Sequence, residues 1–243
     1  LHSFPPRRSS DLVEKVRDLG MKVVIIDRRL NNLAMPFVGS DNYGAGYQLT
    51  NHLVKVGHRL IAFASGDQGL ISSVAERFRG YCTALAEHGL PVDPGLVVNA
   101  GQYIRHASGA AEADGATGRD RMQPPEIAER ILDYLMELDS DRPSAAVVAN
   151  DRTALMLMQS ALRRGIKVPE ALAIVGFDNL DGSATAEVPL TTVKQQFRLM
   201  GKEAARLILE EVFDAKGKPR EVLLPTELVI RRSCGLKELA EAR

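Results

Sequence analysis

The feature that most constrains this chain is a repeated alternation of short apolar segments with longer amphipathic ones. KVVIID at residues 22–27 and AAVVA at residues 145–149 are apolar runs of the kind that form strands covered on both faces. The stretch between residues 74 and 89 instead places Phe78, Tyr81 and Leu85 at helical spacing. Because parallel strands need a helix to return the chain, the alternation predicts an α/β fold with parallel sheets and right-handed crossovers.

Cap and breaker residues predict where these elements end. Gly20 closes a first helix. A second helix, with Leu49 and Leu53 on its apolar stripe, is expected to be capped at its start by Asp41 or Asn42 and to end at Gly57. Further helices are expected over residues 124–138, 151–165 and 197–213. The segment 106–123 holds glycines, small residues and scattered charges without a period, and is predicted to be an irregular loop.

Polar residues that follow the predicted strands are the candidate ligand contacts, because ligands of open parallel sheets bind beyond the carboxyl ends of the strands. Asp178 follows AIVGF, and Asn150 with Asp151 follows AAVVA, so that carboxylate and amide groups could converge on vicinal hydroxyls of a polyol. The alternative for Asn150 and Asp151 is a helix N-cap, and for Asp178 a turn.

Two other side chains also have two interpretations. Arg77 lies near the start of its helix and could direct its guanidinium at a ligand oxygen, or it could be a solvated arginine paired with Glu76 or Asp67. Tyr103 follows a strand and could stack on a sugar or a base, or it could simply pack.

Charge, cysteine and hydropathy patterns exclude several classes. Lys plus Arg and Asp plus Glu both number 31, so no basic surface suited to a nucleic-acid backbone is expected. Cys82 and Cys234 match neither a disulfide framework nor a metal motif. No apolar run reaches the roughly 20 residues of a membrane span, and no secretory signal is visible, so a cytoplasmic location without membrane contact is expected.

The sequence contains no common enzyme signature. There is no GxSxG, and Gly201 with Lys202 is followed by Glu203 rather than by Ser or Thr, which rules out a P-loop. His52 and His58 are spaced unsuitably for a helical zinc pair. The sequence therefore predicts a non-enzymatic protein with no cofactor and no metal.

An ordered set of segments resembles the lactose repressor family, of the LacI type. These are VVIIDRR, VGSDNYGAGYQLTNHLVKVGHRLIAFASG, ERFRGYCTALAEHGL, AAVVANDRTALMLMQSALRRGIKVPEALAIVGFDN, PLTTVKQQFRLMGKEAARLIL and LPTELVIRRSC. The resemblance extends over nearly all of residues 13–234.

The resemblance implies a sensor domain of the type I periplasmic-binding-protein fold, with two Rossmann-like lobes joined by crossing strands. It further implies a small effector, a sugar or related polyol, in the cleft between the lobes, and a homodimer. In this family effector binding is coupled to operator DNA through an N-terminal helix-turn-helix, which these residues do not include.

Site residues are carried over by position from the resemblance. Arg77 in RFRGY matches the family's arginine, and Arg152 falls where members vary, so it is expected to help select the effector. The remaining matches to effector-binding positions are Ser73, Tyr103, Asn150, Asp151, Asp178, Gln195 and Phe197.

The resemblance also sets the expected domain boundaries. Residues 13–100 are assigned to the rest of the N-terminal lobe and the crossover, residues 101–190 to the C-terminal lobe, residues 191–235 to the crossing strand and closing elements, and residues 236–243 to a tail. The first lobe is expected to be incomplete, which predicts marginal stability and aggregation of the isolated chain. The loop 106–123 is longer than the family usually has, which affects the expected contact of Tyr103.

Residues 1–12, LHSFPPRRSSDL, resemble the conceptual translation of a widely used short-read sequencing adapter, LHSFPTRRSSDL, and differ only at Pro6. They are expected to be non-native, although Arg7 and Arg8 alone would suggest a basic arm. Two other functions compete with a repressor's sensor domain: a periplasmic sugar-binding protein of a transporter, which shares the fold, and an enzyme acting on a sugar derivative.

Overall fold

The computed structural model describes residues 9–30, 33–66, 71–99, 124–138, 142–210 and 217–236. The chain divides into two compact units. Unit 1 comprises residues 1–41, 71–73 and 196–225, and unit 2 comprises residues 42–70, 74–195 and 226–243. The expected Tyr103 contact and the predicted loop 106–123 lie outside the described residues.

Unit 2 is built on a parallel sheet with the strand order β4-β3-β5-β6. Its register pairs Ile61 with Ala145 and Ala145 with Ala173, so the carboxyl ends of the strands share one edge. The parallel α/β architecture predicted from the sequence is confirmed. The strands are β3 (Ile61–Ser65), β4 (Val97–Asn99), β5 (Ala145–Val148) and β6 (Ala173–Val175).

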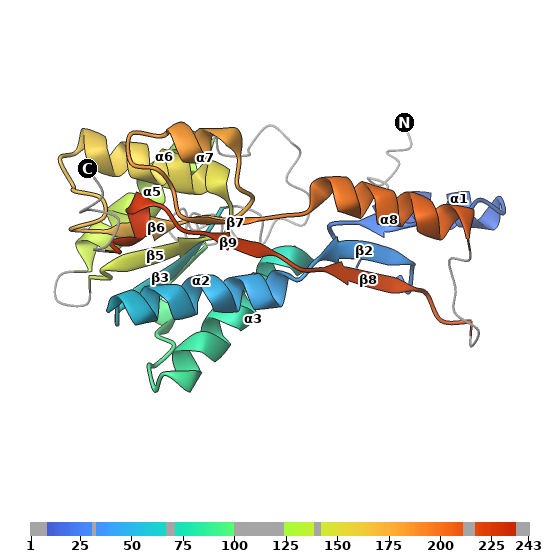
Figure 1. Ribbon diagram of the computed structural model, residues 1–243, viewed down its shortest axis with the longest axis horizontal. Coiled ribbons are helices and arrows are strands. Elements are labelled where there is room, and N and C mark those ends of the chain that lie inside the picture. The colour runs from blue at the N-terminus through green and yellow to red at the C-terminus, as the bar shows by residue number, and fades with distance from the viewer. Residues whose placement is uncertain are drawn as a thin grey trace, which may run out of the picture. The chain divides into compact units, whose positions relative to one another are not determined.

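Helices cover both faces of this sheet (Figure 1). Helices α2 (Asn42–Val56) and α3 (Ser72–Glu87, of which residues from Val74 on belong to unit 2) pack on one face. Helices α5 (Pro124–Glu137) and α6 (Asp151–Arg163) pack on the other. Adjacent strand residues contribute to opposite cores, because side chains alternate along a strand; Phe63 belongs to the α2–α3 core and Ala64 to the α5–α6 core.

Short elements complete unit 2 after the sheet. Helix α7 (Asp181–Thr185) follows β6, and β7 (Thr192–Lys194) pairs antiparallel with β9 (Glu227–Val229). Two 3₁₀ helices, Pro94–Leu96 and Arg232–Cys234, lie before β4 and after β9. Strand β7 leads directly to Gln195, the last residue of the segment 74–195 of unit 2.

Unit 1 contains helix α1 (Ser9–Asp18) and a parallel sheet with the order β1-β2-β8. The strands are β1 (Ile25–Ile26), β2 (Phe37–Ser40) and β8 (Glu221–Leu224), and α8 (Phe197–Leu209) buries Met200, Ala204 and Leu207 against Val38.

The prediction of a doubly buried strand over residues 22–27 is wrong in extent. Strand β1 covers only Ile25–Ile26, and Ile26 is 47% exposed. Within the described residues β1 pairs with β2 alone, so one of its edges and part of its faces remain open.

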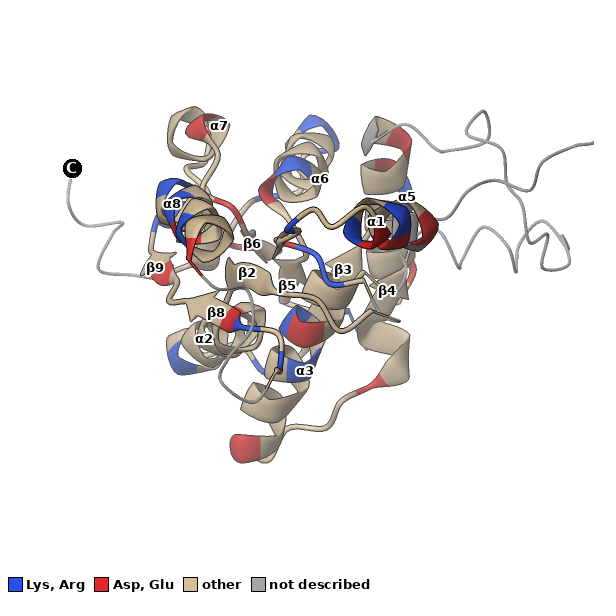
Figure 2. Ribbon diagram, turned by 90° about the vertical axis from the view of Figure 1, so that its right-hand side faces the viewer, with Lys and Arg blue, Asp and Glu red and all other residues tan. Residues whose placement is uncertain are grey.

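No helix in the described ranges is long and apolar enough to cross a membrane. Both signs of charge occur along α1, α6 and α8, as Figure 2 shows.

Candidate functional site

Polar and aromatic side chains gather at the carboxyl edge of the unit 2 sheet. Strands β3, β5 and β6 end here, and the residues after β5 and β6 carry Asn150, Asp151 and Asp178. Helix α3 contributes Arg77 to the same edge, because its guanidinium reaches the backbone that follows β5. These four side chains therefore form the candidate site at the edge where the sequence predicts function.

Arg77 is buried and its guanidinium is held by several contacts. It is 7% exposed, its Nε donates to Asn42 Oδ1 at 2.8 Å, and its Nη1 donates to the carbonyl of Ala149 at 2.5 Å. Its guanidinium carbon lies 3.4 Å from the centroid of the Phe177 ring, a cation–π contact. The alternative of a solvated arginine is wrong, because Arg77 is buried and Glu76 pairs with Arg79 instead.

Two glycines allow the close approach of α2 and α3 that places Arg77. A Cβ at Gly46 would lie 2.1 Å from the Arg77 carbonyl oxygen, and a Cβ at Gly80 would lie 2.1 Å from the Tyr43 carbonyl oxygen. Both contacts are with backbone, which cannot rotate away as a side chain could. The two helices can therefore cross at this distance only where these positions lack a side chain.

Asp178 occupies an unusual turn after β6. Its φ is +128° and that of Asn179 is +55°, in a region that residues with side chains rarely adopt. Its Oδ1 accepts a hydrogen bond from Gln195 Nε2 at 2.6 Å, and its backbone N–H donates to the carbonyl of Val193 at 2.9 Å. The turn thus presents a carboxylate and an amide as one hydrogen-bonded pair.

Asn150 and Asp151 stand where β5 passes into α6. Asn150 is the N-cap, with its side chain accepting from the Thr153 N–H at 2.9 Å, so the capping alternative describes the contact that the structure contains. Asp151 is fully buried, and its carboxylate accepts hydrogen bonds within unit 2. Arg152, the next residue, is exposed.

Six of the predicted site residues that the structure describes lie in unit 2: Arg77, Asn150, Asp151, Arg152, Asp178 and Gln195. Ser73, which is buried, and Phe197, which is 52% exposed at the start of α8, belong to unit 1. Asn42 and Phe177 were not predicted as site residues. From the sequence, Asn42 was only a possible helix cap. Nothing in the sequence around Phe177 indicates that an arginine lies over its ring.

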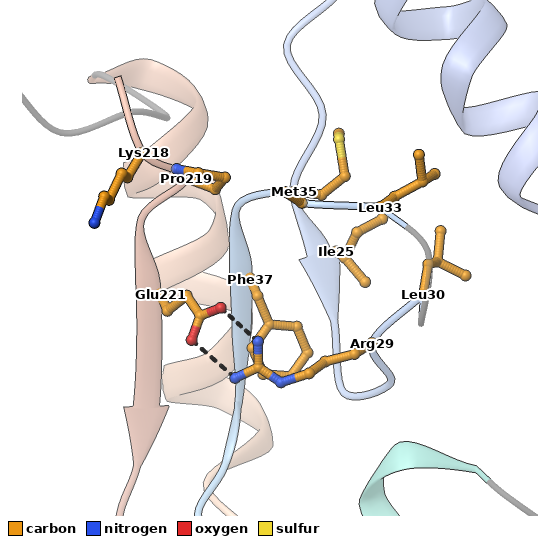
Figure 3. Close-up of a pocket in the computed structure, with 10 residues that line it drawn as sticks. Ile25, Arg29, Leu30, Leu33, Met35, Phe37, Lys218, Pro219 and Glu221 are labelled. Atoms are coloured by element: carbon orange, nitrogen blue, oxygen red, sulfur yellow. Dashed lines mark hydrogen bonds and ion pairs between the residues drawn. The ribbon is translucent and has the colours of Figure 1, made fainter. Parts of the chain in front are cut away.

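Unit 1 contains a separate cavity of about 550 Å³. One wall carries an ion pair, in which Arg29 donates to both carboxylate oxygens of Glu221 at 2.6 and 3.0 Å (Figure 3). This hydrogen bonding lowers the pKa of Glu221, and Arg29 also lies 4.1 Å from the centroid of the Phe37 ring. The cavity contains none of the predicted site residues. Its other lining residues are Ile25, Leu30, Leu33, Ala34, Met35, Lys218 and Pro219.

Within the part of the chain that the structure describes, no group of three or more His, Cys, Asp or Glu side chains is arranged to hold a metal ion.

Comparison with known proteins gives a consistent picture. The profile of the periplasmic binding protein-like domain matches residues 50–234. The HTH-type transcriptional regulator DegA of Bacillus subtilis (strain 168) is 31% identical over 225 residues, which cover 93% of this chain and 60% of DegA. The arabinose metabolism transcriptional repressor of Geobacillus stearothermophilus is 30% identical over 222 residues, which cover 90% of this chain and 55% of the repressor.

Among solved structures, a complex of the transcriptional regulator CelR with cellobiose has a TM-score of 0.72 and 29% identity, over 93% of this chain and 63% of CelR. The chain thus spans about 60% or less of the length of the two curated relatives named above.

Proposed function

The chain belongs to the LacI-type family of transcriptional regulators, through their periplasmic binding protein-like domain, and on this premise we propose that it is the effector-sensing domain of a transcriptional repressor. The observation that carries the proposal is the hydrogen-bonded pair of Asp178 and Gln195, at the same sheet edge as the buried Arg77. The effector is a small polyhydroxylated molecule, most simply a sugar.

The chemistry of the three side chains suits such an effector. The Asp178 carboxylate accepts hydrogen bonds from hydroxyl groups, and carboxylate acceptors form stronger hydrogen bonds than neutral ones. Gln195 holds that carboxylate in one orientation through its 2.6 Å hydrogen bond. Arg77 adds a rigid planar donor, whose direction is set by the Asn42 side chain and the Ala149 carbonyl.

The names of two relatives support the sugar class. One is a repressor of arabinose metabolism, and the other is CelR in complex with cellobiose. Arg152 is exposed at the start of α6, which suits a role in selecting among effectors.

In the longer protein, effector binding shifts the equilibrium between operator-competent and operator-incompetent homodimers. Operator DNA binds through a helix-turn-helix outside these residues, and the protein acts in the cytoplasm. Residues 42–236 therefore supply the sensing step, and the DNA contact is made elsewhere.

A full-length protein that carries this domain would test the proposal. Arg77→Ala or Asp178→Ala should abolish the effector's influence on operator binding while affinity for the operator itself persists, because a lost ligand contact removes the bias between the two states. Arg79→Ala is the matched control, since Arg79 lies on the same helix but is exposed, where its guanidinium pairs with Glu76 and lies over the Tyr43 ring. A normal effector response in either site variant would refute the assignment.

The effector itself can be sought by thermal shift, with cellobiose, arabinose and ribose as first probes. A periplasmic solute-binding protein would also bind a sugar, but the relatives named above are transcriptional regulators, which favours the repressor. The same relatives favour a non-enzymatic domain. Turnover of a sugar derivative that depends on Asp178 would instead support an enzyme.

A further inference from the structure

Asp151 carries a carboxylate that is fully buried in unit 2. It is the first residue of α6 and is 0% exposed. Its backbone N–H donates to the carbonyl of Phe177 at 2.7 Å, which ties the start of α6 to the residue that precedes Asp178. A carboxylate at this depth is costly unless donors surround it.

Three donors meet this carboxylate, and each comes from a segment that follows β6. The Thr192 hydroxyl donates to Oδ1 at 2.6 Å, the Ser183 hydroxyl donates to Oδ2 at 2.6 Å, and the Leu180 N–H donates to Oδ2 at 3.0 Å. Leu180 is the N-cap residue of α7 and makes no side-chain cap hydrogen bond. The Asp151 side chain therefore accepts from the backbone N–H of the α7 N-cap residue, as the N3 side chain does in a capping box.

The backbone beside Asp151 is strained and needs external support. Asp178 and Asn179 both have positive φ, a conformation that costs about 1–3 kcal/mol per residue and persists only where surrounding contacts enforce it. The Asn179 N–H lies 3.4 Å from the Thr192 hydroxyl oxygen, and that hydroxyl donates to Asp151. Thr192 thus connects the turn to the buried carboxylate.

Gly176 shows that the fold reserves space for this carboxylate. A Cβ at position 176 would lie 2.3 Å from Asp151 Oδ1 and 2.9 Å from the Leu190 side chain. Any larger residue would push the carboxylate off its donors. Gly176 therefore leaves the space that the Asp151 carboxylate occupies.

From these contacts we propose that Asp151 is a positioning residue: it holds the Asp178–Leu180 turn and so aims the Asp178–Gln195 pair, without touching the effector itself. The inference rests on the proposed function only in taking Asp178 as an effector contact. The positioning of the turn is a property of the unliganded chain.

The test measures the turn directly, in ¹⁵N-labelled full chain without any ligand. The Gln195 side-chain amide is identified by its loss in Gln195→Ala and reports the bond to Asp178. The Leu180 backbone amide reports the bond to Asp151. Asp151→Ala should shift the Gln195 signal toward that of a solvated amide and speed hydrogen exchange at Leu180 on the order of tenfold.

Asp151→Asn should give an intermediate result, because its amide oxygen can still accept from Ser183 and Leu180. Asn150→Ala, which removes the α6 cap one residue away, should leave both signals in place, and this separates positioning from general loss of helix stability. If Asp151→Ala does not fold, Asp151→Asn and Thr192→Val carry the test.

Unchanged Gln195 and Leu180 signals in folded Asp151 variants would overturn the inference, and so would equal shifts in Asn150→Ala. Titration of the wild-type chain with cellobiose, arabinose and ribose tests the proposed sugar class independently of the positioning role. If none of these sugars binds while the two amides respond as expected, the proposed sugar class fails and the positioning role stands.

Discussion

Replacing Gly46 with alanine tests whether the close crossing of α2 and α3 is what places Arg77. The new Cβ would lie 2.1 Å from the Arg77 carbonyl oxygen, whereas ordinary contact begins at 3.4 Å, so the helices must separate by about 1.3 Å (3.4 minus 2.1). Overpacking of this kind costs about 1–3 kcal/mol or more. Alanine returns about 1 kcal/mol through its higher helix propensity.

Since the clash is with backbone, we take the overpacking cost at about 3 kcal/mol, the upper end of its range. After subtraction of the propensity gain of about 1 kcal/mol, we expect Gly46→Ala to lower the free energy of unfolding by about 2 kcal/mol. That corresponds to a Tm lower by about 4–8 °C for a chain of this size. Urea and thermal melts followed by circular dichroism would measure it.

Gly201→Ala is the matched control, because Gly201 lies within α8 and a Cβ there would meet nothing within 4 Å. It should raise stability by about 1 kcal/mol through propensity alone. If Gly46→Ala were as stable as the original chain, or were stabilised as much as Gly201→Ala, the argument from close packing would fail.

Three further predictions concern other contacts. Burial lowers the pKa of both His52 and His58, so the unfolded chain binds more protons near pH 6.5; stability should be complete above about pH 7.5 and fall as the pH drops through 6.5, and urea midpoints that are flat from pH 8 to 5.5 would contradict this. Tyr81→Phe removes the buried 2.7 Å hydrogen bond to the Ile61 carbonyl and should cost about 1–2 kcal/mol in urea denaturation. Lys22→Met removes the ammonium that donates to the carbonyls of Ile208 and the C-cap residue Glu210 at the end of α8, and because this contact is exposed the loss should stay below about 1 kcal/mol.

The sequence predicted the sheet architecture and the edge at which to look for function. It could do so because strand and helix periods are local properties, visible within a few residues of one another. The helix predicted over residues 124–138 corresponds to α5 (Pro124–Glu137) for the same reason. Strand β1 shows the limit: its apolar residues predicted burial, but burial depends on neighbouring strands that the local pattern does not reveal.

The burial and hydrogen-bond partners of each candidate site residue could be known only from the tertiary structure. Arginines are usually solvated, and Arg77 is buried only because Gly46 admits the α3 backbone and Phe177 lies beneath its guanidinium. Asn150 could equally have been a cap or a ligand contact from its sequence context, and only its hydrogen bond to Thr153 identifies the cap.

Asp151 best illustrates the difference between what the sequence determines and what only the tertiary structure decides. The sequence alone determined that an acidic residue follows β5 at the carboxyl edge of a parallel sheet, since that depends on the order of elements along the chain. Only the tertiary structure decided what its carboxylate does, because its donors Leu180, Ser183 and Thr192 lie 29, 32 and 41 residues away. Local periodicity carries no information over such separations, whereas folding brings the three donors to one buried charge.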